Sequence, residues 1–445
     1  MDILIKIAQL FLCFTILVGI HELGHFLMAR AFKIRVEKFY IFFDPWFSLF
    51  KFKRGDTEYG LGWLPLGGYV KIAGMIDESM DKEQMKQPVK PDEFRAKPAW
   101  QRLLVMVAGV MMNVLLAIVI YCAVCYTWGD SYFSNQDAKW GYNFNPTAHE
   151  MGFRDGDRFV SIDGEEIDNV MRVQNDLLIT DGGRRVIVER GGEPVTLDIP
   201  FESLLRMRQE KAYEDLFTLR LPFIVDSVSY TSAVEAGLES GDEVVAIDDL
   251  RDADYPRYRD YLQKHKNDKV LLTVRRDGAL IDSLALPVDA EGRIGVTVTN
   301  PYSLRTQYYT FWESIPAGIH KAGKTISSYW DQLKLIVQPK TKMYEELGGF
   351  VAIGSIFPSS WDWHDFWLKT AFLSIILAVM NLLPIPGLDG GHALFTLWEI
   401  ITRRKPSEKF LEVAQYVGLM IIPVSYTHLR AHETGLDLVC RLLLE

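Results

Sequence analysis

Cysteine is scarce in this chain: four residues occur in 445 positions, and the two that lie close together, Cys122 and Cys125, belong to an apolar run. A disulfide framework is therefore not expected, and the cysteines are interpreted as small apolar residues. Basic residues are not in surplus either, because the net charge at pH 7 is −10. This charge balance gives no reason to expect nucleic acid as a partner.

Charge is absent altogether from residues 103–128. About 20 apolar residues are enough to cross a bilayer core of roughly 30 Å, so this segment predicts a membrane span. Further spans are expected at residues 3–28, at residues 366–386 and, with a weaker pattern, from Phe410. No small-residue cleavage site follows the first span, which is therefore interpreted as retained rather than as a secretory signal. Asn113, within the second span, is interpreted as an interhelical hydrogen-bonding residue.

Lysine and arginine are concentrated in residues 30–102 and 403–409, which separate the first span from the second and the third from the fourth. Because these residues are enriched in cytoplasmic segments, both segments are expected to be cytoplasmic. The long section between the second and third spans is then expected on the opposite side of the membrane, by alternation alone.

That long section contains an internal repeat. The stretch TAHEMGFRDGDRFVSIDGEEI begins at Thr147 and SAVEAGLESGDEVVAIDDLRD begins at Ser232, a period of about 85 residues. Each copy places a Gly-Asp turn before an apolar strand and ends in a hairpin-like run. The pattern resembles the PDZ domain and predicts two β-rich domains, at 131–220 and 221–304, with generic β-sandwich modules as the alternative. Such domains either bind extended peptides or act as a steric filter.

Two further segments have amphipathic or glycine-rich patterns. Residues 305–362 are expected to be a connector, and their stretch FWESIPAGIHKAGKTISSYWDQLKLIV predicts an amphipathic helix. That helix either lies on the outer membrane surface or packs on the two domains. The stretch GWLPLGGYVKIAGM, from Gly62, predicts a re-entrant hairpin beside the first span. Such backbone is tolerated at membrane depth where it is buried in protein or lines a water-filled cavity.

The apolar run FTILVGIHELGHFLMARAF contains three ionisable residues where such groups are energetically costly. His21 and His25 are four residues apart, so they share one face of a helix and can hold one metal ion. Glu22 is adjacent and can act as general base on a water molecule, with zinc as the default metal. The alternative is a pair of buried, hydrogen-bonded histidines. It is disfavoured because ionisable groups inside a membrane span are functional by default.

A catalytic zinc ion needs a third protein ligand. Asp44, Asp56 and Glu58 lie in the segment after the first span and are candidates there. Asp389 is preferred, because the end of the third span and the HELGH end of the first span are expected at the same cytoplasmic depth.

The sequence around Asp389, NLLPIPGLDGGHALF, is rich in turn-forming residues. Its prolines are expected to end the helix, and Gly390 and Gly391 to free the backbone so that Asp389 turns inward. His392 is an additional candidate, either as a hydrogen-bond partner of a ligand or as a spare ligand. Asn381, in the preceding span, either binds a substrate carbonyl or the developing oxyanion, or makes an interhelical hydrogen bond.

Together, HELGH in a first span, PLGGYVK, FRAKPAWQRLLVMVAGVMMN, the repeated domains and NLLPIPGLDGGH resemble the site-2 protease family, peptidase family M50. The resemblance covers nearly the whole chain and implies one zinc ion as cofactor, with Glu22 as the catalytic base. The metal ligands that it implies are His21, His25 and Asp389. The substrate-binding residues that it implies are Gly67, Gly68, Tyr69 and Asn381.

The same resemblance implies a polytopic α-helical membrane protein with about four transmembrane helices, a membrane-associated β-hairpin or sheet, and two extracytoplasmic PDZ domains. Residues 1–130 and 363–424 would form its membrane part. The expected location is the bacterial inner membrane, with the PDZ domains periplasmic and the active site near the cytoplasmic side. Expected partners are membrane lipid, signal-peptide remnants and single-span membrane proteins such as anti-sigma factors that another protease has already trimmed. This activity would be regulated intramembrane proteolysis in a stress response, with the PDZ pair excluding untrimmed substrates.

Two other functions are compatible with parts of the sequence. One is an inactive tandem-PDZ membrane scaffold, against which the intact ligand and base positions argue. The other is an anchored metalloprotease that acts on soluble peptides, with its third ligand in residues 33–97. Residues 425–445 depart from the family pattern, because polar residues arrive where the family continues apolar. The pair His428 and His432 in this tail is assigned no function.

Overall fold

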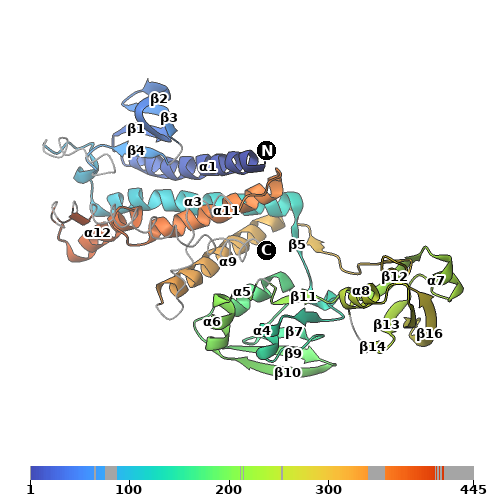
Figure 1. Ribbon diagram of the computed structural model, residues 1–445. Helices are drawn as coiled ribbons and strands as arrows, with labels where there is room; N and C mark the ends of the chain where they lie inside the picture. Colours follow the sequence, from blue (N-terminus) through green and yellow to red (C-terminus); the bar gives the residue numbers. More distant parts are fainter. Residues whose placement is uncertain are drawn as a thin grey trace. The chain divides into compact units, whose positions relative to one another are not determined.

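The computed structural model divides the chain into two compact units. Unit 1 combines Met1–Asp130 with Gln307–Glu445, and unit 2 is Ser131–Thr306. Unit 1 contains the long apolar helices and a small β-sheet, whereas unit 2 is built from short strands and helices (Figure 1). The residues that the structure describes are 2–64, 67–75, 88–210, 212–213, 215–251, 254–338, 356–405, 407, 410 and 413–414.

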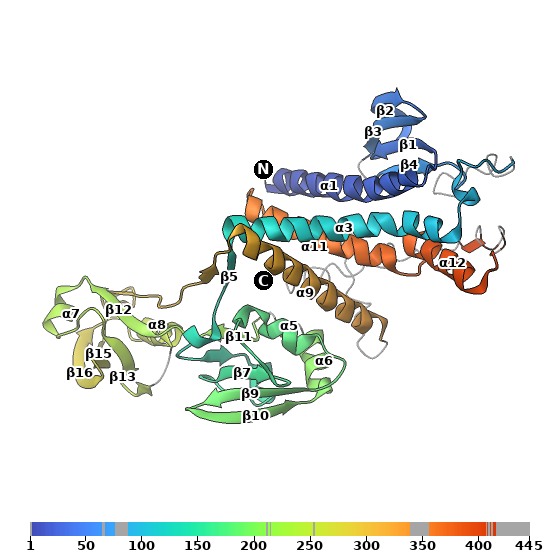
Figure 2. The same ribbon diagram turned by 180° about the vertical axis from the view of Figure 1, so that it is seen from behind.

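Three long apolar helices dominate unit 1: α1 (Asp2–Ala31), α3 (Ala99–Trp128) and α11 (Trp363–Leu382). They run side by side in both views (Figures 1 and 2), with α3 in contact with α1 and α11. Each is long and apolar enough to cross a membrane. Within the described residues these three are the candidate spans, and the fourth expected span lies almost entirely outside those residues, as does the 425–445 tail.

A further long helix, α9 (Phe311–Val337), packs on α3 and α11. It begins at a capping box, in which Thr310 and Glu313 satisfy each other's backbone groups. The approach to α3 is close, because a Cβ added at Gly318 would lie 2.5 Å from the backbone nitrogen of Cys122. The sequence predicted that this helix lies on the outer membrane surface or packs on the two β-rich domains. The structure shows it packed on the apolar helices α3 and α11.

A four-stranded sheet follows α1. Its strands, in the order β2-β3-β1-β4, are β1 (Val36–Ile41), β2 (Phe43–Arg54), β3 (Thr57–Leu64) and β4 (Tyr69–Ile72). β1 pairs in parallel with β3 and antiparallel with β4, so the expected hairpin from Gly62 is wrong. β1 lies between β3 and β4, and its side chains form the buried centre of the sheet. Val36 and Tyr40 are fully buried, and the Tyr40 ring covers the backbone of Gly60.

Unit 2 consists of two β-rich halves, and the chain enters and leaves it through a paired β5 (Asp130–Tyr132) and β18 (Arg305–Gln307). The strands of the first half are β6 (Tyr142–Phe144), β7 (Arg158–Ile162), β8 (Glu165–Glu166), β9 (Arg184–Arg190), β10 (Glu193–Ile199) and β11 (Phe217–Leu219). Its helices are α4 (Pro146–Glu150), α5 (Val173–Leu178) and α6 (Phe201–Gln209). The strands form one sheet in the order β10-β9-β7-β8, while β6 pairs with β11.

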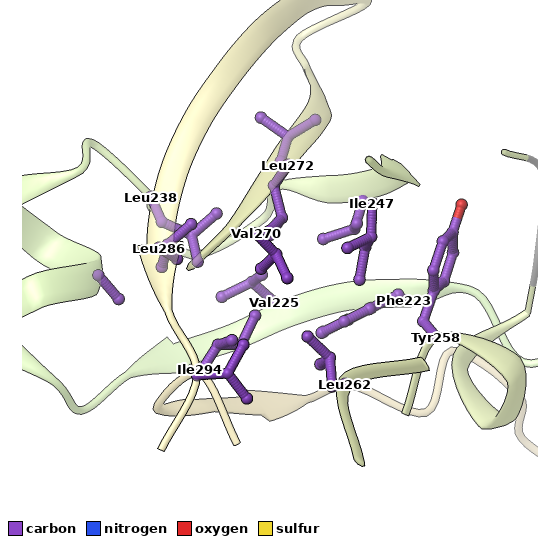
Figure 3. Packing of buried hydrophobic residues seen from close by; sticks show 14 residues of the cluster. Phe223, Val225, Leu238, Ile247, Tyr258, Leu262, Val270, Leu272, Leu286 and Ile294 are labelled. Carbon is purple, nitrogen blue, oxygen red and sulfur yellow. The ribbon is translucent and has the colours of Figure 1, made fainter. Parts of the chain in front are cut away.

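The second half has one larger sheet, in the order β16-β15-β13-β12-β17, with β14 beside β13. Its strands are β12 (Phe223–Val228), β13 (Glu243–Ile247), β14 (Leu250–Arg251), β15 (Lys269–Arg276), β16 (Ala279–Pro287) and β17 (Val296–Val298). Its helices are α7 (Thr231–Glu235) and α8 (Tyr255–Lys264). Figure 3 shows its core, where Val225, Ile247 and Leu272 from three strands gather with Leu262 of α8. Burial alternates along β15, as expected for a strand with one face on the core.

Both halves of unit 2 contain the same buried ion pair at the Gly-Asp turn. Asp157 accepts two hydrogen bonds from Arg190, at 2.8 and 2.7 Å, and Asp242 accepts two from Arg276, both at 2.7 Å. The two carboxylates are fully buried. Each arginine also donates a hydrogen bond to a glycine carbonyl oxygen, Arg190 to Gly152 and Arg276 to Gly237. The repeat in the sequence therefore recurs as an equivalent tertiary contact in each half.

The charge of Arg276 decides the ionisation of its buried partner. Burial raises the pKa of Asp242, but the hydrogen bonds from Arg276 outweigh this effect and hold the pKa below its usual value. A carboxyl group with a lowered pKa stabilises the folded state above its unfolded pKa. The pair therefore contributes fully at neutral pH, and its contribution is lost as the pH falls below about 4.

Arg276→Met is expected to destabilise the second half of unit 2 by about 3 kcal/mol, because the buried Asp242 carboxylate would lose its counter-ion. Hydrogen–deuterium exchange of peptides from β13 and β15 in the full-length protein measures this loss. Arg275→Met is the matched control: Arg275 is half exposed and pairs with Glu243 at the surface, so a loss below about 1 kcal/mol is expected. Equal exchange in the two variants would contradict the prediction.

Candidate metal centre

Helix α1 places both histidines of the HELGH motif on one buried face. His21 and His25 are each 7% exposed, and their Nε2 atoms lie 3.2 Å apart. The spacing produces this arrangement, because side chains at i and i+4 lie on the same side of a helix. The two rings meet edge to face, with centroids 4.9 Å apart.

Asp389 is the first residue of α12 (Asp389–Thr402), which follows α11 after a short turn. Its Oδ2 atom lies 3.0 Å from Nε2 of His21 and 3.2 Å from Nε2 of His25. Gly387 makes the turn possible, because its φ of 96° is in the left-handed region that glycine adopts readily. The turn thus brings a carboxylate distant in sequence to the two imidazoles.

The glycines after Asp389 have a different role from the expected one. Gly390 and Gly391 are inside α12, and a Cβ at either position would lie within 2.6 Å of a backbone carbonyl oxygen that precedes Asp389. They therefore allow the start of α12 to pack closely on the chain leaving α11, rather than freeing the backbone. Farther along α12, an ion pair between Arg102 and Glu399, at 2.6 Å, joins the helix to α3.

The three side chains form a triangle that fits a zinc ion. Their facing nitrogen and oxygen atoms are 3.0–3.2 Å apart. A tetrahedral zinc ion with bonds of about 2.0–2.1 Å holds its ligand atoms roughly 3.3 Å apart. A carboxylate binds a metal ion in its ionised form, which Asp389 would take in this group.

Helix α3 provides the groups that lie behind the two imidazole rings. Nδ1 of His25 lies 2.8 Å from the backbone carbonyl oxygen of Val105, and Nδ1 of His21 lies 3.2 Å from the side-chain amide of Asn113. Gly109 lies between them, and a Cβ added there would be 2.4 Å from Nε2 of His25. The missing side chain at Gly109 therefore leaves space beside the ligand atoms.

Glu22 lies where α1 meets the β-sheet. The backbone N–H of Val70 in β4 donates a hydrogen bond to the Glu22 carboxylate. A Cβ added at Gly68 would lie 3.5 Å from Cγ of Glu22, so the chain entering β4 also runs beside this side chain. A carboxylate that could act as a general base thus lies beside the candidate metal site and the start of β4.

The model of peptidase family M50 matches residues 9–425. The chain belongs to this family. It is similar to proteins named "Putative zinc metalloprotease" in several bacteria. One from Clostridium perfringens is 30% identical, covering 92% of this chain and 93% of the relative. Another from Vibrio cholerae is 29% identical, covering 95% and 96%, and one from Neisseria meningitidis is 26% identical, covering 92% and 94%. The M50 family uses zinc, which confirms the predicted family and cofactor of this metalloprotease.

The predicted substrate-binding residues of this M50 protease lie partly at the start of β4. Gly67 and Gly68 precede the strand, and Gly67 has a φ of 143°, which favours glycine. Tyr69 is engaged within the sheet: its ring stacks on Tyr40, and its hydroxyl donates to Asp44 at 2.9 Å. Burial and the neighbouring Asp44 carboxylate raise the pKa of the Tyr69 phenol well above its usual value.

The other predicted site residues lie near α12. Asn381 is half-buried in the last turn of α11. His392 lies in the first turn of α12, where its carbonyl accepts a hydrogen bond from Thr396. Among the described residues, the group of side chains close enough to hold a metal ion consists of the two HELGH histidines and Asp389. The sequence candidates that are not part of this group are Asp44, Asp56, Glu58 and His392.

Sequence reasoning missed the contribution of α3. The interhelical hydrogen bond expected for Asn113 exists, and its partner is the candidate metal ligand His21. Val105, Gly109 and Asn113 recur every four residues, so they form one stripe along the helix. The signal available in the sequence was this stripe, with its single amide, in a segment without charge.

Gly109→Ala is expected to weaken zinc binding by about 10- to 100-fold, because the new methyl group would displace the His25 ring from its ligand position. Competition between the purified M50 protease and a chromophoric chelator measures the affinity. Gly323→Ala in α9 is the matched control, since a Cβ there meets no atom within 4 Å, and its zinc affinity should equal that of the wild type. Unchanged affinity in Gly109→Ala would show that this space is not needed.

Proposed function

We propose that this M50 metalloprotease hydrolyses peptide bonds within the membrane-spanning segments of other proteins. One observation carries the proposal: both histidines and Glu22 belong to α1, a helix that is long and apolar enough to cross a membrane. A zinc ion held by this helix would lie at membrane depth. The peptide bonds within its reach would be those of membrane-spanning segments.

The residues of the site divide the chemistry between them. His21, His25 and Asp389 would hold the zinc ion, which when bound polarises a carbonyl group and lowers the pKa of a water molecule toward neutrality. Glu22 would act as general base, taking a proton from the attacking water and later giving it to the leaving amine. The hydrogen bond from Val70 orients the Glu22 carboxylate for this role.

A helical substrate has to unwind locally, because the carbonyl groups of a helix are hydrogen-bonded within it. β4 offers an extended partner, since within the described residues it pairs with β1 along a single edge. A substrate strand would add to the sheet there, beside Glu22, and pass over Gly67, Gly68 and Tyr69. Asn381 would then bind a substrate carbonyl or the developing oxyanion.

Unit 2 would act as a pair of PDZ domains that exclude untrimmed substrates by size. The repeated ion pair and the similar order of strands and helices in its two halves support this assignment. The substrates would be single-span proteins such as anti-sigma factors, after trimming by another protease, together with signal-peptide remnants. This activity would be regulated intramembrane proteolysis in a stress response.

The protein would lie in the bacterial inner membrane, with unit 2 periplasmic and the active site near the cytoplasmic side. The basic residues that follow α1 and α12 support this orientation. β2 supports contact with lipid, because Trp46 is 90% exposed and Phe47 and Phe50 are more than half exposed. Lys51 and Lys53 lie next to these aromatic residues, a combination suited to the headgroup region of an anionic leaflet.

The decisive experiment uses the purified full-length protein and a single-span substrate of the anti-sigma type, supplied full-length or with its periplasmic part trimmed. We expect cleavage of the trimmed form within its span, little cleavage of the full-length form, and loss of both with a zinc chelator. Cleavage of soluble peptides but not of the trimmed span would refute the intramembrane assignment. Equal cleavage of the two forms would refute the size filter alone.

A further inference from the structure

We propose that Asn113 is a positioning residue that holds the His21 ring with Nε2 free for the metal, by accepting a hydrogen bond from its Nδ1–H group. The inference rests on the zinc site of the proposed function and adds a residue on a third helix to it. Asn113 belongs to α3, its side chain is fully buried, and its amide nitrogen Nδ2 lies 3.2 Å from Nδ1 of His21.

The chemistry of imidazole determines which amide atom must face the ring. A neutral histidine carries one proton, and Nε2 can bind a metal only if that proton is on Nδ1. Nδ1–H is then a donor, so its partner must be an acceptor. The Asn113 amide has such an acceptor, because its buried Oδ1 has no hydrogen-bond partner among the described residues. Rotating the Asn113 amide group by 180° about its Cβ–Cγ bond exchanges Oδ1 and Nδ2, which have nearly the same size and shape. This rotation brings Oδ1 of Asn113 to Nδ1 of His21.

The second histidine has an equivalent arrangement. Nδ1 of His25 lies 2.8 Å from the backbone carbonyl oxygen of Val105, which can only accept. The proton of His25 is therefore on Nδ1 as well, and its Nε2 faces Asp389. Val105 and Asn113 lie two helical turns apart on the stripe of α3 that faces α1, so one helix sets the protonated nitrogen of both ligands.

The backbone of Asn113 is held from a third side. Ser374 of α11 donates a hydrogen bond from its hydroxyl group to the Asn113 carbonyl oxygen, at 2.8 Å. All three apolar helices therefore meet at this residue: α11 at its backbone, α3 as its own helix and α1 through His21. A residue that only joined helices would need no acceptor toward the ring, and this difference separates the two roles experimentally.

The test measures the zinc affinity of the purified full-length protein by chelator competition, without substrate. Asn113→Leu removes the acceptor with little change in size, and we expect affinity to fall by about 10- to 100-fold. Asn113→Asp keeps an acceptor and removes the donor, so its affinity should stay within about threefold of the wild type or rise. An amide that donated to Nδ1 would give the opposite result for Asn113→Asp.

Gln9→Leu is the matched control. Gln9 is an equally buried amide on α1, far along the helix from the histidines, and it donates to the carbonyl oxygen of Pro358. Its replacement removes a hydrogen bond between α1 and the segment that precedes α11, and should leave zinc affinity unchanged. A loss in Gln9→Leu as large as in Asn113→Leu would attribute the effect to general loosening and overturn the inference.

Two further results would also overturn it: wild-type affinity in Asn113→Leu, or a fall in Asn113→Asp as large as in Asn113→Leu. If Asn113→Leu does not yield folded protein, Asn113→Asp decides alone, because it removes the amide donor and keeps an acceptor with almost no change in shape. A wild-type protein that binds zinc as described but cleaves no membrane substrate would refute the proposed function and leave this inference standing.

Discussion

Glu22→Gln is expected to abolish peptide-bond cleavage while leaving zinc content and affinity at wild-type values. The metal ligands are unchanged, and the glutamine oxygen can still accept the hydrogen bond from Val70. An amide cannot take a proton from water, so the general base is lost. General-base catalysis contributes on the order of 10²- to 10⁴-fold, and cleavage of a trimmed single-span substrate should fall by at least that factor.

The measurement pairs two readouts on the same preparation: initial cleavage rate and bound zinc by mass spectrometry of the metal. Glu58→Gln is the matched control, because Glu58 lies in the neighbouring β3 and accepts a hydrogen bond from the Tyr40 hydroxyl, as glutamine also can. It should keep both cleavage and zinc. Full activity of Glu22→Gln would remove the base assignment and leave the zinc site intact.

Asp389→Ala is expected to remove zinc and cleavage together. Two histidines alone leave the ion without the three protein ligands that a catalytic zinc site uses. The loss should exceed that of Gly109→Ala, which keeps all three ligands and displaces one. Chelator competition and bound zinc measure the affinity, and cleavage of the trimmed substrate measures the activity.

Asp56→Ala separates this site from one with a ligand nearer in sequence. Asp56 is exposed in the turn between β2 and β3, and as an acidic residue after α1 it is one of the sequence candidates for the third ligand. It should keep zinc and activity. Zinc retention in Asp389→Ala with zinc loss in Asp56→Ala would reverse the assignment and favour a site that faces soluble substrates.

The sequence was sufficient for features that depend on near neighbours along the chain. The length of each apolar run predicts α1, α3 and α11, because the helix rise and the bilayer thickness are both known quantities. The four-residue spacing of His21 and His25 predicts their shared face for the same reason. Asp389 was reached differently, by counting spans and comparing depths, since no local pattern relates it to the histidines.

The features that the sequence did not reveal are contacts between distant segments. β1 lies between β3 and β4 because Tyr40 packs over Gly60, a pairing that no turn signal near Gly62 indicates. Gly390 and Gly391 look like flexible residues in the sequence, yet they serve close packing within a helix. Burial against a particular neighbour is a property of the folded chain, and a residue type alone does not specify that neighbour.

What the sequence by itself determined is which side chains α1 brings to the candidate site of this M50 metalloprotease: two imidazoles and the Glu22 carboxylate on one apolar helix. Only the tertiary structure decided what completes the site. It brought Asp389 to the histidines, set Val105 and Asn113 behind their rings, and left the space at Gly109 beside them. The physical reason is that helix periodicity acts over a few residues, whereas the packing of α1, α3 and α12 joins atoms that are far apart along the chain.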